Sequence, residues 1–311
     1  VLEHYDEADC KSSDFRTLRR NLMTILVSMA ADSESAILLI FHGNGILLNI
    51  LKRFLTDESD SIIRKKAACA LRLLAHDSST PLLIHDADLM HALSDAALLD
   101  NSQEVRQEAS DAFARCAALV QAEQQPHYEA VLDALVLLAT SAFNPLNRGR
   151  QTVSADVLAQ TLREQSSHSC NRRLIANRPI LLDTVAEIAL RGVPGFATQE
   201  ACCTLMHLSM EEENCDILVN HPTVLDALVS NAASYSPSHQ DNDLTDGEPI
   251  GRTKLHSLRA LLNLARSPYR GVLARHPFLL QTLIRITATL PSDTLMRTEL
   301  KKFVLHLAEE L

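Results

Sequence analysis

The sequence contains no tryptophan, and aromatic residues make up only 4% of its 311 residues. A core without large rings must be built from Leu, Ala, Ile and Val, and hydrophobic residues reach 46% of the chain. Such side chains suit closely packed helices. Eight Gly and eleven Pro are too few for a turn-rich all-β protein. These scarcities predict an all-α protein with a large aliphatic core.

Positive charge is also scarce, because 29 Lys and Arg stand against 39 Asp and Glu, for a formal net charge of -10. Proteins that bind nucleic acid usually carry an excess of Lys and Arg over Asp and Glu. An acidic surface more readily meets a basic peptide or protein, and it also favours solubility. The charge therefore predicts no nucleic-acid partner and leaves a protein or peptide partner.

The seven cysteines form no CxxC pair and no closely spaced framework. Most lie inside apolar helical runs, which predicts reduced core residues in an intracellular protein, cytoplasmic or nuclear. No apolar run reaches the length of a membrane span, and the polar start is no signal peptide, so we expect no membrane association. The chain starts without Met, which favours a segment of a longer protein.

Catalytic and metal-binding motifs are missing. The chain has no HExxH, GxSxG, P-loop or GxGxxG pattern. The pair Cys202-Cys203 lies in an apolar helical run and is expected in the core. His42, His221 and His276 recur at the same turn before a helix, which predicts a structural role. We therefore expect no enzyme activity, no cofactor, no metal and no small-molecule substrate.

Helical periodicity begins near Phe15, after a polar lead-in at residues 1–14. The rest, residues 15–311, is predicted to be one repeat domain with an acidic loop insertion at 234–250. That insertion is interpreted as a solvated loop, or alternatively as an acidic flap over a groove. The first expected helices span 15–30, 37–41, 46–55, 62–75, 89–99, 104–118 and 127–139.

Similar helical units repeat along the chain. At an offset of 43 residues, Leu162 matches Leu205, and Pro179 matches Pro222. Proline suits the first turn of a helix, so its recurrence in phase favours true repeats. Equivalent helix-end positions are Ala30, Ala75, Ala117, Ser166, Ser209, Ala265 and Ala308. Their spacing matches armadillo and HEAT units rather than shorter repeats.

The segment Ala260-Leu261-Leu262-Asn263-Leu264-Ala265, supported by residues 70–75, resembles the final-helix phrase of the armadillo repeat family. The resemblance covers roughly residues 15–311, with HEAT-like repeats as the alternative. It implies a right-handed superhelix of about six three-helix units and a terminal helix. It further implies a concave groove lined by each unit's last helix, which binds protein or peptide and performs no catalysis.

The chain departs from this family at the groove. Family members that bind extended peptides carry Asn at the position of Asn263 in successive units, and Trp lines the groove of nuclear-import adaptors. Only one of the seven equivalent residues is Asn here, and Trp is absent. These residues are Ser28, Leu73, Arg115, Glu164, His207, Asn263 and His306.

Five residues are expected on or near the concave face and form our candidate binding set: Arg72, Arg115, His207, Arg259 and Asn263. Arg suits recognition because its planar fork can pair with a carboxylate through two hydrogen bonds; scattered solvated Arg is the alternative interpretation. The sequence thus predicts a protein-interaction scaffold or adaptor. The alternative function is a structural or regulatory module of a larger multidomain protein.

Overall fold

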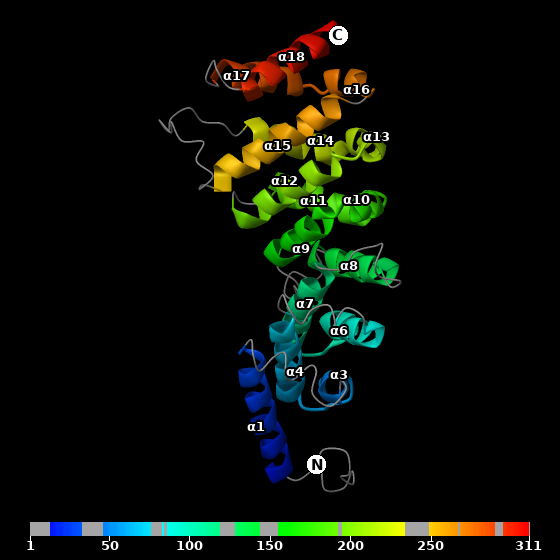
Figure 1. Cartoon of the computed structure of the whole chain (residues 1–311), viewed down its shortest axis with the longest axis vertical. Coiled ribbons are helices and arrows are strands. Elements are labelled where there is room, and N and C mark those ends of the chain that lie inside the picture. Colours follow the sequence, from blue (N-terminus) through cyan, green and yellow to red (C-terminus); the bar gives the residue numbers. More distant parts are fainter. Residues whose placement is uncertain are drawn as a thin grey trace. The chain divides into compact units, whose positions relative to one another are not determined.

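The computed structural model describes residues 13–32, 46–75, 83, 86–118, 128–143, 155–191, 195–233, 249–266, 268–289 and 295–310. These ranges contain 16 helices and no strand. The chain divides into two compact units, and among the described residues the first runs through Phe143 and the second starts at Ala155. The prediction of an all-α solenoid is confirmed (Figure 1).

The first unit is built from two rows of helices. In one row α1, α4 and α7 pack in succession, and in the other α3, α6 and α8 do so (Figure 1). Its described helices are α1 (Ser13–Ala30), α3 (Ile46–Thr56), α4 (Ser61–Leu74), α6 (Ala87–Leu99), α7 (Gln103–Ala118) and α8 (Tyr128–Phe143). In α4, Ile63, Ala67, Leu71 and Leu74 are buried at the spacing of one helix face.

The second unit repeats a three-helix pattern, so its helices form three rows (Figure 1). The first helices of each repeat are α10 (Ser169–Ala176), α13 (Glu212–Asn220) and α16 (Arg270–Ala274). The second helices are α11 (Pro179–Arg191), α14 (Pro222–Ala233) and α17 (Leu279–Thr289). The last helices are α12 (Phe196–Leu208), α15 (Pro249–Ala265) and α18 (Leu295–Glu309), preceded in their row by α9 (Ala155–Ser167).

Alanine allows the last helices of the second unit to pack closely. Ala159 of α9, Ala201 of α12 and Ala260 of α15 are each completely buried, and α12 packs directly against both neighbours. A methyl side chain lets two helix backbones approach without leaving a void. The helices α9, α12 and α15 therefore pack side by side without gaps and hold the exposed side chains of this row in fixed positions.

Helix ends follow the repeat positions derived from the sequence. Each of the seven predicted helix-end residues lies within one residue of the end of α1, α4, α7, α9, α12, α15 or α18. Pro179 and Pro222 open α11 and α14, as predicted. The expected helix 37–41 lies outside the described residues. Helix α15 begins at Pro249, so the last two residues of the predicted insertion are helical, and 234–248 lie outside the described residues.

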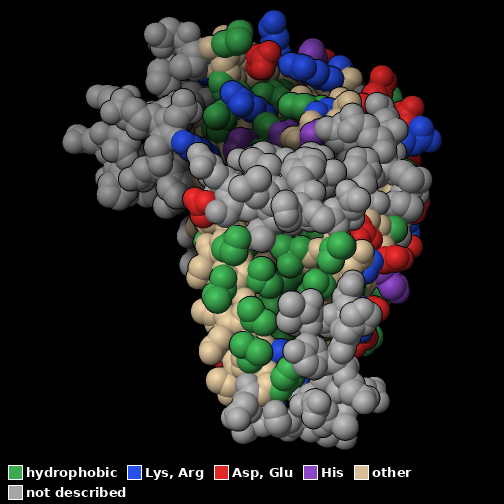
Figure 2. All heavy atoms as spheres, turned by 60° about the horizontal axis from the view of Figure 1, so that its bottom comes forward, with side chains coloured by type: hydrophobic (Ala, Val, Ile, Leu, Met, Phe, Trp, Pro, Cys, Tyr) green, Lys and Arg blue, Asp and Glu red, His purple; other side chains and the backbone are tan. Residues whose placement is uncertain are grey.

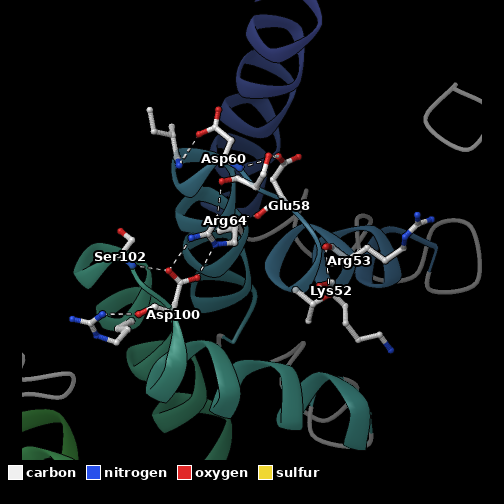
Figure 3. A network of polar contacts seen from close by, with 11 residues as sticks. Lys52, Arg53, Glu58, Asp60, Arg64, Asp100 and Ser102 are labelled. Carbon is white, nitrogen blue, oxygen red and sulfur yellow. Dashed lines mark hydrogen bonds and ion pairs between the residues drawn. The ribbon is translucent and has the colours of Figure 1, made fainter. Parts of the chain in front are cut away.

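Polar side chains tie successive repeats together. In the first unit, Arg64 of α4 binds both carboxylate oxygens of Asp100, at 2.7 and 2.9 Å, and also donates to the carbonyl of Glu58 at 2.9 Å (Figure 3). Asp100 in turn accepts from the backbone N–H of Ser102 at 2.7 Å. One guanidinium thus joins the residues preceding α4 and those preceding α7.

The recurrent histidines of the second unit have the predicted structural role. His221 Nε2 lies 3.2 Å from Asp183 of α11, and His276 Nε2 lies 3.0 Å from Asp226 of α14. Asp183 and Asp226 occupy equivalent repeat positions, so the same contact joins two pairs of neighbouring repeats. The third residue of this set, His42, lies outside the described residues.

Candidate binding surface

One face of α15 carries a row of basic and polar side chains. Helical spacing places Arg252, His256, Arg259 and Asn263 on that face, because they follow one another at intervals of three or four residues, and Arg266 follows in the turn after the helix. The three Arg are exposed, and His256 and Asn263 are half-buried. We call these five residues the α15 stripe. Figure 2 shows Lys, Arg and His side chains around a hollowed part of the surface near the top of the view.

The adjacent helix α12 adds less charged side chains. Helical spacing puts Phe196, Cys203 and His207 on one face, and Met210 follows in the turn after the helix. Phe196 is 49% and Met210 51% exposed. Together with the α15 stripe, these four residues form what we call the α12–α15 surface.

Two of the predicted site residues bind the preceding repeat. Asn263 Nδ2 donates to Ser209 Oγ at 3.1 Å, and His207 Nδ1 lies 3.0 Å from Ser166 Oγ. Asn263 and His207 occupy equivalent positions, and so do Ser209 and Ser166. Both residues of this repeat position thus supply a bond between repeats.

Burial and neighbouring cations keep the histidines of this surface neutral. The pKa of His207 is lowered to about 4, first by burial and then by Arg172 and Arg163. The pKa of His256 is lowered by burial and by Arg259 and other Arg residues. At neutral pH the positive charge of the surface therefore comes from its Arg side chains.

The corresponding surface of the first unit is charge-paired. Arg72 Nε donates to Glu108 Oε2 across α4 and α7 at 2.8 Å, and Lys65 Nζ lies 2.9 Å from Glu104. Asp111 adds a further carboxyl group there, whose pKa is raised mainly by burial. Arg72 and Lys65 therefore form ion pairs between repeats.

The predicted binding set is divided between the units. Arg72 and Arg115 belong to the first unit, whereas His207, Arg259 and Asn263 lie on two adjacent helices of the second. Arg115 and Arg259 are both exposed, and within the described ranges neither side chain has an ion-pair partner. The structure thus brings together His207, Arg259 and Asn263. Of these three, Arg259 carries a charge that is not paired within the described ranges.

Three residues of the α15 stripe are not in the binding set predicted from the sequence: Arg252, His256 and Arg266. Their spacing from Arg259 is the sequence signal that indicates them. Ser166 and Ser209 match at the 43-residue offset, which marks them only as repeat positions. Their hydrogen-bonding role requires the side-by-side packing of neighbouring last helices.

The cysteine pair on α12 is split by the helix geometry. Cys202 is completely buried, as predicted, and burial raises its pKa to about 12. The core prediction was wrong for Cys203, which is only half-buried, because one residue along a helix turns the side chain by about 100°. The pKa of Cys203 is raised to about 11, mainly by burial, so its thiol stays protonated at neutral pH.

Three other features concern the described ranges: metal-ligand clusters, surface hollows and membrane-spanning helices. Within these ranges no group of three His, Cys, Asp or Glu side chains is placed to hold a metal ion. A hollow of about 480 Å³ lies beside α16 and α17, with Arg275, His276, Leu280 and Ile284 in its lining. None of the helices searched is long and apolar enough to cross a membrane.

Comparison with solved structures places the fold among armadillo-type repeats. The chain is similar to the designed armadillo repeat protein YIII(Dq)4CqI, with 16% identity and a TM-score of 0.59 over 85% of this chain and 99% of that one. It is also similar to a designed armadillo repeat protein in complex with the peptide (KR)4, with 19% identity, a TM-score of 0.61 and coverage of 81% and 96%.

An engineered protein gives 18% identity and a TM-score of 0.57 over 85% of this chain and 97% of its own. No protein-family model matches the sequence, and a comparison with curated proteins gave no match. At these identities the similarity concerns the fold. The armadillo-type architecture predicted from residues 70–75 and 260–265 is therefore confirmed.

Proposed function

We propose that the chain is a non-catalytic protein-interaction scaffold that binds a segment of a partner protein across the α12–α15 surface. The observation that carries the proposal is the α15 stripe, whose Arg259 is exposed and has no ion-pair partner in the described ranges. Exposed Phe196 and Met210 add apolar contact area beside it. Arg and aromatic side chains are the types that contribute most to protein interfaces.

The fold and the chemistry of the surface support binding without turnover. An armadillo-type solenoid commonly serves as a scaffold, and one of the similar designed proteins was solved with a peptide. The groups that most resemble catalytic ones, His207 and Cys203, are a neutral imidazole bonded to Ser166 and a protonated thiol. The proposal therefore includes no substrate, cofactor or nucleic acid. It places the protein inside the cell, in keeping with the free thiols of the six described cysteines.

A peptide-display selection against the whole chain tests this function. Selected peptides are expected to slow amide hydrogen exchange in α12 and α15, and Arg259→Glu is expected to weaken their binding without changing helicity. Arg53→Glu is the matched control, because Arg53 is an exposed Arg of α3 in the first unit. Protection confined to other helices, or equal effects of the two reversals, would overturn the proposal.

A further inference from the structure

Helix α15 differs in charge from the chain that contains it. The chain as a whole has a formal net charge of -10, yet residues 249–266 contain four Lys and Arg residues and no Asp or Glu. These cations are Arg252, Lys254, Arg259 and Arg266. A local excess of positive charge on an acidic protein favours binding of a negatively charged ligand there and disfavours a positively charged one.

Among the described residues, the acidic side chains near the α15 stripe form ion pairs with Arg. Glu200 is buried and its Oε2 accepts from Arg163 Nε at 2.7 Å, while Glu164 lies 2.5 Å from the same guanidinium. Glu299 of α18 lies 3.7 Å from Arg266. Within the described ranges no acidic side chain forms an ion pair with Arg259, so its charge is available to an incoming carboxylate.

The electrostatic neighbourhood of the two histidines points the same way. Arg259, Arg252 and Arg163 all act to lower the pKa of His256, and Arg163 acts likewise on His207. These Arg side chains therefore oppose protonation of the two rings, although Arg163 itself is paired with Glu200 and Glu164. An anion bound beside Arg252 and Arg259 would offset this effect on His256.

The dimensions of the stripe suit a short extended segment. From Arg252 to Ala265 helix α15 advances about 20 Å, at about 1.5 Å per residue. An extended chain covers that length with about six residues. In the described part of the first unit, helix α4 also carries four Lys and Arg, but Arg64, Lys65 and Arg72 are each paired with a carboxylate from the next repeat.

We infer that the partner segment on the α12–α15 surface is acidic, a stretch of about six residues rich in Asp or Glu whose carboxylates pair with Arg259 and its neighbours on α15. This inference rests on the proposed function and specifies the chemistry of its ligand. It also separates this chain from the designed relative solved with (KR)4, because the basic stripe would repel such a peptide.

The test is fluorescence anisotropy of the whole chain with a labelled octaglutamate peptide. We expect binding that weakens as salt rises from about 50 to about 500 mM. Arg259→Glu is expected to raise the Kd at least about tenfold, and Arg259→Gln by a smaller factor. Arg115→Glu makes the same charge change on an exposed Arg of the other unit, and is expected to change the Kd less than about twofold.

A second readout reports directly on the surface. Nuclear magnetic resonance titration of the His207 and His256 rings should show their pKa values rising when octaglutamate is bound, because the bound carboxylates offset the nearby Arg charges. Their assignments follow from His207→Gln and His256→Gln. Unchanged pKa values with bound peptide would contradict the inference.

The competing outcomes distinguish the two proposals. Tighter binding of (KR)4 than of octaglutamate would overturn the inference that the partner is acidic. Equal losses of octaglutamate affinity from Arg259→Glu and Arg115→Glu would overturn it as well. If uncharged peptides from the display selection still protect α12 and α15, the proposed function stands without it. If no peptide of any charge protects these helices, both proposals fail.

Discussion

At the scale of single residues, two different side chains at the same repeat position form the same kind of hydrogen bond. Asn263 has an amide and His207 a larger aromatic ring, yet each bonds a Ser at the end of the preceding last helix. Both side chains are long enough to cross from one helix to the next. In these two repeats the residue at this position therefore joins one last helix to the next.

Removing this bond should cost stability. We expect Asn263→Ala to lower the free energy of unfolding by about 1 kcal/mol, the usual net value of a partly buried hydrogen bond. Chemical denaturation of Asn263→Ala, Ser209→Ala and the double variant measures the coupling between the two side chains. If the losses of the two single variants simply add up in the double variant, the contact between Asn263 and Ser209 contributes nothing to stability. The Asn263 amide would then be available to a ligand.

The lowered pKa of His207 predicts a pH dependence of stability. Its folded pKa of about 4 lies below the unfolded value of 6.5, so the unfolded chain binds more protons between these values. The stability is complete above pH 6.5 and falls as the pH drops toward 4. Because the ring is partly exposed, we expect a loss on the order of 1 kcal/mol.

Denaturation at a series of pH values with wild type and His207→Gln checks this effect. The variant should lose less stability between pH 6.5 and 4 than wild type does. His306→Gln is the control, because His306 occupies the equivalent position in α18 and is exposed. A parallel pH profile for wild type and His207→Gln would contradict the assigned burial.

At the scale of helices, ion pairs between successive last helices differ in their burial. Arg163 of α9 binds Glu200 of α12, whose side chain is only 7% exposed, whereas the pair of Lys65 and Glu104 is 40% and 71% exposed. Removing the partner of a buried carboxylate leaves an uncompensated charge. An exposed pair contributes little because water screens both charges.

Replacing the basic residue of each pair by Met should therefore lower stability by unequal amounts. We expect Arg163→Met to lower the free energy of unfolding by more than about 2 kcal/mol, and Lys65→Met by less than about 0.5 kcal/mol. Thermal and urea unfolding of both variants provide the comparison. Similar losses would mean that water reaches Glu200 and that the α9–α12 contact is looser than its geometry indicates.

The helices were largely predictable from the sequence because their signals are local. Apolar spacing, the in-phase prolines and the Ala-rich helix ends placed every last helix to within one residue of its end. The site was less predictable, since it depends on which side chains face one another across two helices. Arg72 looked like Arg259 in the sequence, and only the position of Glu108 on the next helix separates the paired Arg from the exposed one.

At the scale of the whole molecule, the contacts within each unit are mainly between neighbouring elements of the repeat pattern. In such a solenoid, stability is the sum of repeat and nearest-neighbour contributions, so damage should remain local. The sequence predicts one repeat domain over residues 15–311, and the two compact units give a way to test how far cooperativity extends along it.

Arg64 offers the sharpest perturbation for that test, because it joins Asp100 to the carbonyl of Glu58 and its side chain is only 14% exposed. We expect Arg64→Met to reduce amide exchange protection in α4 and α7 by about tenfold or more, the equivalent of about 1.4 kcal/mol, while α15 keeps its wild-type protection. Arg53→Met is the control, since Arg53 is exposed on α3. Equal loss of protection in α4 and α15 would instead show that the chain opens as one cooperative domain, because a fully coupled solenoid transmits the same free-energy change to every repeat.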